Sequence, residues 1–205
     1  MGDDTGATRR VRADARRNID ALLDAAKAVF ATSGVDAPVR EIAARAGVGV
    51  GTVYRHFPQR SDLVVAVFQY EVDATADAAG VLAGEHAPGE ALARWLRRFA
   101  GFIATKRGLA AALHSGDPAF APLPGYFDER LRPALQSLLS AAVAAGEVRA
   151  DVEADDVLDA IRSLAASTSK DRPGHAERVV DLFIDGLRYG AAGTGGPDQA
   201  RINSA

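Results

Sequence analysis

The segment VREIAARAGVGVGTVYRHFPQRSDLVVAVF, residues 39–68, contains two short helix patterns separated by a glycine. The patterns predict helices over Val39–Ala46 and Val50–His56. Gly47 lies between them, where glycine adopts a positive φ without steric strain. Pro58 ends the second helix because proline lacks the N–H that a helix interior needs. The segment therefore has the pattern of a helix-turn-helix.

The apolar residues of this segment fall where two crossing helices need them. Ile42, Val48 and Val53 are predicted to form a small core that sets the angle between the helices. Ala43 is small where the second helix crosses closely. Two short helices also occur in ordinary helical bundles, but the small residues at these particular positions favour the helix-turn-helix.

The other face of the second predicted helix is polar. It carries Thr52, Arg55 and His56, with Tyr54 near its edge. Such side chains are able to reach base edges and phosphates when a helix lies in the major groove of DNA. The pattern favours a recognition helix.

Charge is distributed unevenly along the chain. Residues 9–60 hold ten basic and five acidic residues, although the whole chain has a net charge of −3. A basic N-terminal part on an acidic body is typical of a localised contact with a polyanion. Arbitrary clustering of solvated charges on the surface is the alternative.

Composition excludes several classes of protein. Because the chain has no cysteine, disulfides, cysteine zinc sites and thiol catalysis are excluded. The four histidines are scattered, and the chain has no phosphate-binding glycine loop or paired-histidine metal motif, so we expect neither an enzyme nor a cofactor or metal. No signal peptide or membrane-spanning run is apparent, which favours a cytoplasmic protein that does not bind membranes.

Helical periodicity continues on both sides of the segment, and alternating strand patterns are absent. We therefore predict an all-α chain with about nine helices, in which a three-helix helix-turn-helix domain precedes a larger helical bundle. The predicted helices cover Asp14–Ser33, Val39–Ala46, Val50–His56, 60–79, 90–105, 109–114, Tyr126–Ala145, 155–168 and Ala176–Tyr189.

The segment resembles the N-terminal domain of the TetR family of bacterial transcriptional regulators. The resemblance is carried by the run Gly51–Tyr54, by Phe57-Pro58 and by the basic Arg60, and it covers roughly residues 12–72. The phrases RWLRRFAGFIATKRGLAAAL and AAVAAGEVRADVEADDVL are similar to a C-terminal domain common in such regulators.

The resemblance implies a domain organisation. Residues 1–14 are expected to form a flexible basic arm, and residues 15–62 a DNA-binding domain joined to a long helix that reaches about residue 79. Residues 80–190, beginning with a hinge over 80–89, are expected to bind a ligand and to dimerise. The tail over 191–205 is expected to be disordered.

The resemblance also implies roles in DNA binding. Thr52 and Arg55 would contact bases or neighbouring phosphates, while Tyr54, His56 and Arg60 would contact phosphates. The residues expected at the DNA are Arg40, Val50, Gly51, Thr52, Tyr54, Arg55, His56 and Arg60.

The chain departs from the family pattern at three positions. Gly49 replaces a frequent capping serine, Val50 a frequent lysine or polar residue, and Pro38 a common phosphate-binding threonine. Val50 either meets a thymine methyl group or stays in solvent. The arginines of the N-terminal arm either enter a minor groove or form a solubilising tail.

In the family the last two helices form a four-helix interface with the partner subunit. The expected interface residues, for which an intramolecular core is the alternative, are Leu158, Ile161, Leu164, Val180, Phe183 and Leu187.

The helices before them surround an effector cavity in the family, which implies an apolar site for an unknown, small, hydrophobic molecule. Arg98 would orient a polar ligand or lie on the surface. The expected ligand-binding residues, for each of which packed core is the alternative, are Trp95, Phe99, Phe102, His114, Phe120, Tyr126, Phe127 and Leu131.

These expectations describe a homodimeric repressor that binds palindromic operator DNA and is released by a small effector. A regulator without an effector and an activator are the alternatives.

Overall fold

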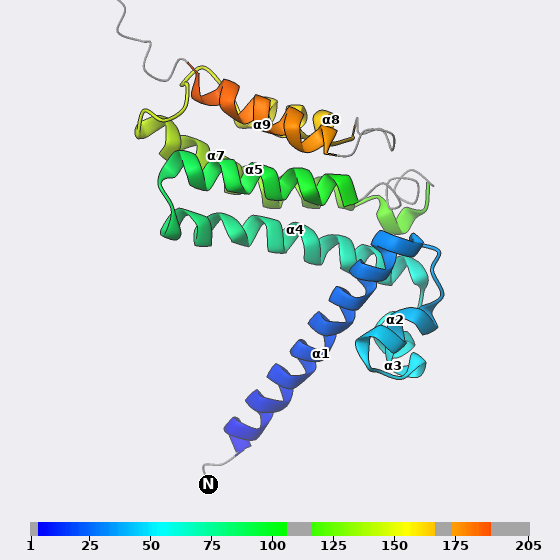
Figure 1. Ribbon diagram of the computed structural model, residues 1–205. Coiled ribbons are helices and arrows are strands. Elements are labelled where there is room, and N and C mark those ends of the chain that lie inside the picture. Colours follow the sequence, from blue (N-terminus) through cyan, green and yellow to red (C-terminus); the bar gives the residue numbers. More distant parts are fainter. Residues whose placement is uncertain (1–3, 106–115, 167–173, 190–205) are drawn as a thin grey trace, which may run out of the picture. The chain divides into compact units, whose positions relative to one another are not determined.

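The computed structural model describes residues 4–105, 116–166 and 174–189. Within these ranges the chain forms eight α-helices and one short 3-10 helix, η1 (Pro118–Phe120), and no strand (Figure 1). The predicted all-α class is thus confirmed. The helix predicted over 109–114 and the tail over 191–205 lie outside the described ranges. None of the described helices is long and apolar enough to cross a membrane.

The chain divides into two units, which combine segments that are distant in sequence. Unit 1 comprises Met1–Val72 and Thr105–Phe127, and unit 2 comprises Asp73–Ala104 and Asp128–Ala205. This division differs from the predicted boundary near residue 80, because helix α4 (Arg60–Glu85) contributes residues to both units.

Unit 1 is built on α1 (Asp4–Ser33), α2 (Val39–Ala46), α3 (Val50–His56) and the beginning of α4. In Figure 1, α2 and α3 lie against each other beside the C-terminal end of α1. At the start of α4, the Asp62 carboxylate accepts the N–H of Gln59 at 2.8 Å and caps the helix. The unit therefore holds the two short helices on a scaffold of two longer ones.

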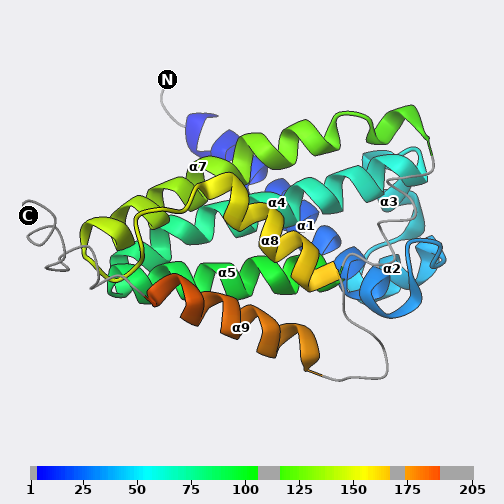
Figure 2. The same ribbon diagram turned by 90° about the horizontal axis from the view of Figure 1, so that it is seen from above.

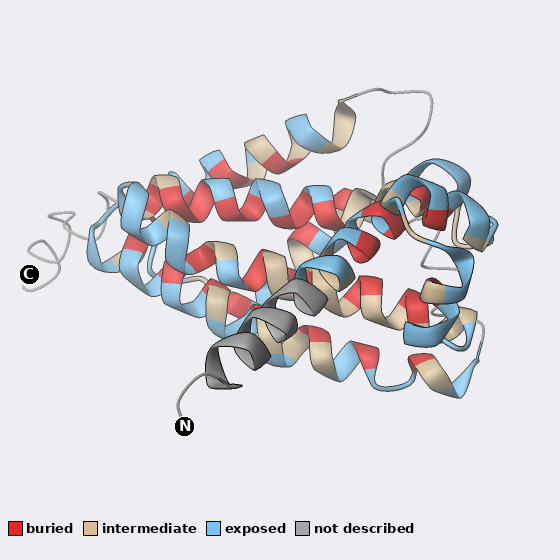
Figure 3. Cartoon of the chain, turned by 90° about the horizontal axis from the view of Figure 1, so that it is seen from below, coloured by how far each residue is buried: buried red, intermediate tan, exposed pale blue. Residues whose placement is uncertain are grey.

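Unit 2 contains the second half of α4 together with α5 (Pro88–Thr105), α7 (Leu123–Ala144) from Asp128 on, α8 (Ala154–Ala166) and α9 (His175–Arg188). Helices α4 and α5 run antiparallel beside each other, and α8 packs on α9 (Figure 2). Figure 3 shows the buried residues as stripes along these helices, as expected for amphipathic helices around a core.

Several helix bounds differ from those predicted. Helix α1 begins at Asp4, so it includes residues 4–14, for which the sequence predicted an arm before the helix. Helix α4 continues through Gly80 and Gly84 to Glu85, which replaces most of the predicted hinge. Glycine lowers helix stability without forbidding the helix, so its presence is a weak stop signal.

Candidate nucleic-acid interface and ligand pocket

The helix-turn-helix core forms as the sequence predicts. Ile42, Ala43 and Val53 are at most 1% exposed, and they belong to a cluster that also includes residues of α1 and α4. Val48 packs against this cluster from its edge. The crossing of α2 and α3 is therefore set by the residues that the sequence singled out. The other buried members of the cluster are Leu22, Leu23, Ala26, Val29, Ala37, Leu63 and Val67.

The turn between the two helices depends on Gly47. Its φ of 69° and ψ of 27° lie in the left-handed region, where a side chain would strain the backbone. The N–H of Gly47 bonds to the carbonyl of Ala44, and the N–H of Val48 bonds to that of Ala43. These bonds satisfy carbonyls at the end of α2 and fix the direction in which α3 leaves it.

Helix α3 presents one face away from this core. Tyr54 is 50% exposed and Val50 is 40% exposed, whereas Val53 on the opposite face is 1% exposed. Arg55 and His56 are exposed as well, and Thr52 is half-buried. The outward face therefore combines hydroxyl, basic and apolar groups, as the sequence predicts. On α2, Arg40 is also exposed.

Arg60 has a structural role that the sequence does not reveal. Its Nε donates to the Val35 carbonyl at 2.7 Å, and its Nη2 donates to the Ala37 carbonyl. The guanidinium thus ties the first turn of α4 to the segment that precedes α2. The guanidinium has five N–H donors, so these two bonds leave donors for the phosphate that the resemblance implies.

Helices α1 and α4 are joined by polar contacts beside the same core. Lys27 Nζ lies 2.6 Å from the Glu71 carboxylate, which is only 12% exposed. Burial raises the pKa of the Tyr70 phenol, and the nearby Asp24 carboxylate raises it further. The Tyr70 hydroxyl is hydrogen-bonded to the Asp24 carboxylate. These contacts support the scaffold that carries α2 and α3.

The predicted ligand-binding aromatics of α5 are packed. Trp95 and Phe99 are fully buried with their ring centroids 5.5 Å apart, and Phe102 stacks on Phe99 at 6.3 Å. Trp95 Nε1 also donates to the Thr75 carbonyl at 2.8 Å. For these three residues the observed environment is that of a close-packed core.

The remaining predicted ligand-binding residues are divided between the units. Phe120, Tyr126 and Phe127 belong to unit 1, Leu131 is fully buried in unit 2, and His114 lies outside the described residues. These predicted ligand-binding residues all lie near the proline-rich loop in the sequence, but the structure does not bring them together in one unit.

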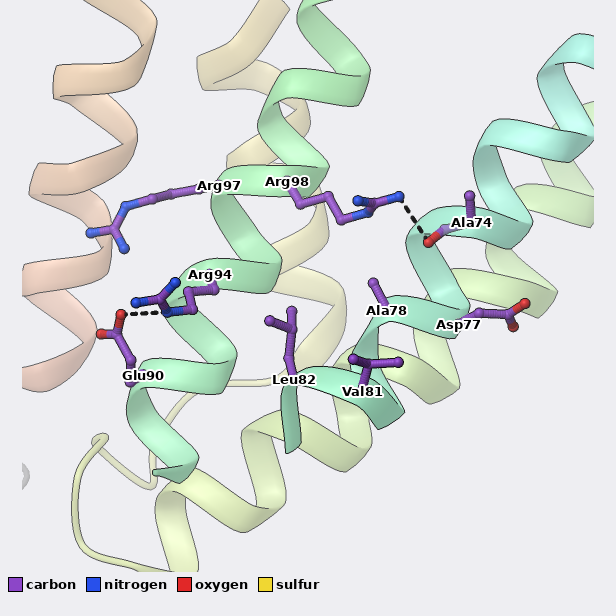
Figure 4. Close-up of a pocket in the computed structure, with 9 residues that line it drawn as sticks. All are labelled: Ala74, Asp77, Ala78, Val81, Leu82, Glu90, Arg94, Arg97 and Arg98. Atoms are coloured by element: carbon purple, nitrogen blue, oxygen red, sulfur yellow. Dashed lines mark hydrogen bonds and ion pairs between the residues drawn. The ribbon is translucent and has the colours of Figure 1, made fainter. Parts of the chain in front are cut away.

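An open pocket of about 750 Å³ lies between α4 and α5 of unit 2 (Figure 4). Its apolar wall is contributed mainly by α4, where Val81 is 58% exposed. Of its charged residues, only Arg98 was predicted from the sequence to meet a ligand. The lining residues are Ala74, Asp77, Ala78, Val81, Leu82, Glu90, Arg94, Arg97 and Arg98.

The three arginines of this pocket already have partners within unit 2. Arg98 Nη2 donates to the Ala74 carbonyl at 3.0 Å, and Arg94 Nε lies 2.8 Å from Glu90. Arg97 extends toward α9, where it pairs with Asp181 at 2.8 Å. An entering anion would have to share or replace these exposed contacts.

Helices α8 and α9 bury most of the residues predicted for a dimer interface. Leu158, Ile161, Val180 and Leu187 are at most 4% exposed in the single chain, so each belongs to its core. Leu164 and Phe183 are half-buried. Leu182, which the interface prediction omitted, is 70% exposed, and Tyr189 is 85% exposed. In this part of the described chain the large exposed apolar side chains are therefore Leu182 of α9 and Tyr189 at its C-cap.

Comparisons with known proteins agree with this geometry. Residues 22–67 match the family model described as bacterial regulatory proteins, tetR family. Residues 87–189 match the model of the C-terminal domain of SbtR-like transcriptional regulators. Together the two models cover both the helix-turn-helix and the helices of unit 2.

Two of the similar solved structures match most of the chain. The TetR transcriptional regulator SCO0520 from Streptomyces coelicolor is 40% identical, with a TM-score of 0.72, over 82% of this chain and 97% of its own. A TetR transcription regulatory protein from Mycobacterium vanbaalenii is 41% identical, with a TM-score of 0.70, over 87% and 99%.

Among curated proteins, an HTH-type transcriptional regulator of Staphylococcus aureus is 38% identical over 64 residues. The match covers 31% of this chain and about a third of that regulator's length (35%).

Proposed function

Because the chain belongs to the TetR family of transcriptional regulators, we propose that it is a repressor which binds palindromic operator DNA as a homodimer and is released by a small molecule. The observation that carries the proposal is the outward face of α3, which holds Thr52, Tyr54 and Arg55 on a helix fixed by a buried core. A helix so presented fits the major groove, where Arg reads guanine and hydroxyl groups bond to bases or phosphates.

Selection of bound sequences from random duplex DNA tests this proposal. We expect the purified chain to enrich a palindrome, because one short recognition helix reads only a few base pairs and two copies related by a two-fold axis read both half-sites. A gel-shift titration of the enriched duplex against a scrambled one measures the specificity. Enrichment of no sequence, or equal affinity for the two duplexes, would contradict the proposal.

The outer face of α9 supports dimerisation. Leu182 and Tyr189 are large and exposed, and the half-buried Phe183 lies next to Leu182 in the sequence. An apolar stripe of this kind is expected to be covered, because exposed apolar surface in contact with water is unfavourable. A second copy related by a two-fold axis would present the same stripe and cover it.

We expect Leu182→Glu to convert the dimer into a monomer, since burying an unpaired carboxylate at the interface is strongly unfavourable. Light scattering after size-exclusion chromatography measures the mass. Val81→Glu is the matched control, because Val81 is also exposed in unit 2 but lies in the pocket, and this variant should remain dimeric. A dimeric Leu182→Glu variant would show that the interface lies elsewhere.

Release by a small molecule is supported by the pocket in unit 2. It joins an apolar wall on α4 to three arginines on α5, a combination suited to an amphiphilic anion. Because α4 also contributes residues 60–72 to the DNA-binding unit, movement of its second half would reposition α3. A ligand must bind the released state more tightly by a few kcal/mol to shift the equilibrium almost completely.

A screen of amphiphilic carboxylates by thermal shift, followed by operator release, separates this mechanism from a regulator without an effector. A compound that stabilises the chain and dissociates the operator supports the proposal, and a screen without any such compound favours the alternative.

A further inference from the structure

Residues 49–51 contain two glycines, Gly49 at the N-cap of α3 and Gly51 in its first turn, and packing among the described residues requires glycine at neither position. Gly49 has a φ of −72°, and Gly51 is not among the glycines with positive φ. Neither therefore adopts the left-handed backbone conformation that requires glycine at Gly47. A Cβ at Gly51 would meet nothing within 4 Å, and a Cβ at Gly49 would meet only the Thr52 hydroxyl at 4.0 Å.

At another glycine of the chain, a neighbouring side chain leaves little space for a Cβ. A Cβ at Gly89 would lie 2.6 Å from the Glu147 carboxylate and 3.0 Å from the Glu147 Cβ, so the Glu147 side chain would have to shift to admit it. Gly51, in contrast, is the second residue of α3 and would meet no neighbouring atom through a Cβ. Close approach of a partner from outside the chain would account for a residue without a side chain at this position.

Val50 lies between these two glycines and supplies the only side chain within residues 49–51. It is 40% exposed, although valine is usually buried. Its isopropyl group can neither donate nor accept a hydrogen bond. Of the groups that base pairs present in the major groove, the C5-methyl of thymine is the one that such a side chain recognises by contact.

We propose that residues 49–51 approach the base edges closely and that the Val50 side chain packs on a thymine methyl group in each half-site. The inference rests on the proposed binding of operator DNA and names the chemical group that this turn reads. Gly49 and Gly51 then serve to let the backbone approach, while Val50 determines the preference for thymine.

Replacing single thymines of the selected operator by deoxyuridine tests the role of Val50. Deoxyuridine keeps the base pair and removes only the methyl group. At one position of each half-site, we expect the substitution to weaken binding by roughly fourfold, and by about fifteenfold when both half-sites are changed. Fluorescence anisotropy at fixed salt measures both affinities.

Val50→Ala should bind the thymine operator more weakly and should no longer distinguish it from the deoxyuridine operator. Val152→Ala, which shortens a half-buried valine of unit 2 outside the pocket, should distinguish the two operators as the unchanged protein does. If the unchanged protein binds both operators equally at every position, or if Val50→Ala still distinguishes them, the proposed contact is wrong.

Gly51→Ala tests the close approach. Because the position is helical and the space around it is open, the melting temperature should be unchanged or higher, while operator affinity should fall about tenfold or more. Gly80→Ala is the matched control, since Gly80 is helical with nothing within 4 Å of its Cβ, and this variant should keep full affinity.

If the Gly51→Ala variant binds the operator as tightly as the unchanged protein does, the proposed close approach of residues 49–51 to the base edges is wrong. If selection enriches no operator, the proposed function itself fails. If an operator is found but its affinity is indifferent to the thymine methyl groups, only the present inference fails.

Discussion

Replacing Trp95 with alanine should lower the free energy of unfolding of unit 2 by about 3–5 kcal/mol. Trp95 is fully buried, stacks on Phe99 and donates its indole N–H to the Thr75 carbonyl. Alanine would remove the ring contacts and leave a cavity that helices α4 and α5 refill only in part. The expected loss is a large fraction of the stability of an ordinary domain.

Circular dichroism at increasing urea concentration measures this loss. The chain has a single tryptophan, so the variant has no tryptophan fluorescence to follow. Trp95→Phe is the control, because it keeps an aromatic ring beside Phe99 and removes the N–H donor, and its destabilisation should be clearly smaller. If Trp95→Ala were destabilised by less than about 1 kcal/mol, the site would resemble an adaptable cavity, and the interpretation of Trp95 as a ligand-binding residue would gain support.

Replacing Arg60 with alanine should lower the free energy of unfolding of unit 1 by about 1.5–3 kcal/mol. The same change should weaken the affinity for every DNA sequence to about the same extent. The guanidinium donates to the carbonyls of Val35 and Ala37. Without these bonds the segment before α2 is released, and the position of the helix-turn-helix relative to α4 becomes less defined.

The dependence of operator affinity on salt separates this structural role from a phosphate contact. If Arg60 also neutralises a phosphate, the slope of log K against log salt concentration should become shallower by about 0.9 for each phosphate that the guanidinium neutralises. If Arg60 acts only on the backbone, the slope should stay unchanged while stability falls. Arg55→Ala is the control, because Arg55 is exposed on α3, and this variant should keep its stability but change its sequence preference. Unchanged stability and affinity in Arg60→Ala would contradict both roles.

The sequence predicted the helix-turn-helix almost completely because its signals are local. The bounds of α2 and α3 coincide with those predicted. Gly47 adopts the positive φ for which a glycine was expected, and the side chains on either face of α3 follow from a period of 3.6 residues. The family was also recognisable there, because these constraints combine at fixed spacing within a single short segment.

The interpretation of the C-terminal half was less complete for a physical reason. An aromatic stripe such as Trp95 and Phe99 has the same pattern whether it fills a core or lines a cavity. Leu158 and Val180 likewise belong to the core of the single chain, whereas Leu182, at 70% exposure, was not singled out. Whether an apolar side chain is buried depends on packing against residues that are distant in the sequence.

The sequence alone therefore determined the helical class, the helix-turn-helix and the family, since each depends on periodicity, turn chemistry and short spacings. Only the tertiary structure decided the role of Arg60, whose carbonyl partners lie 25 and 23 residues away, and the place of the pocket between α4 and α5. Contacts of this range arise from the packing of whole helices, and no local pattern of residues encodes which side chains the packing brings together.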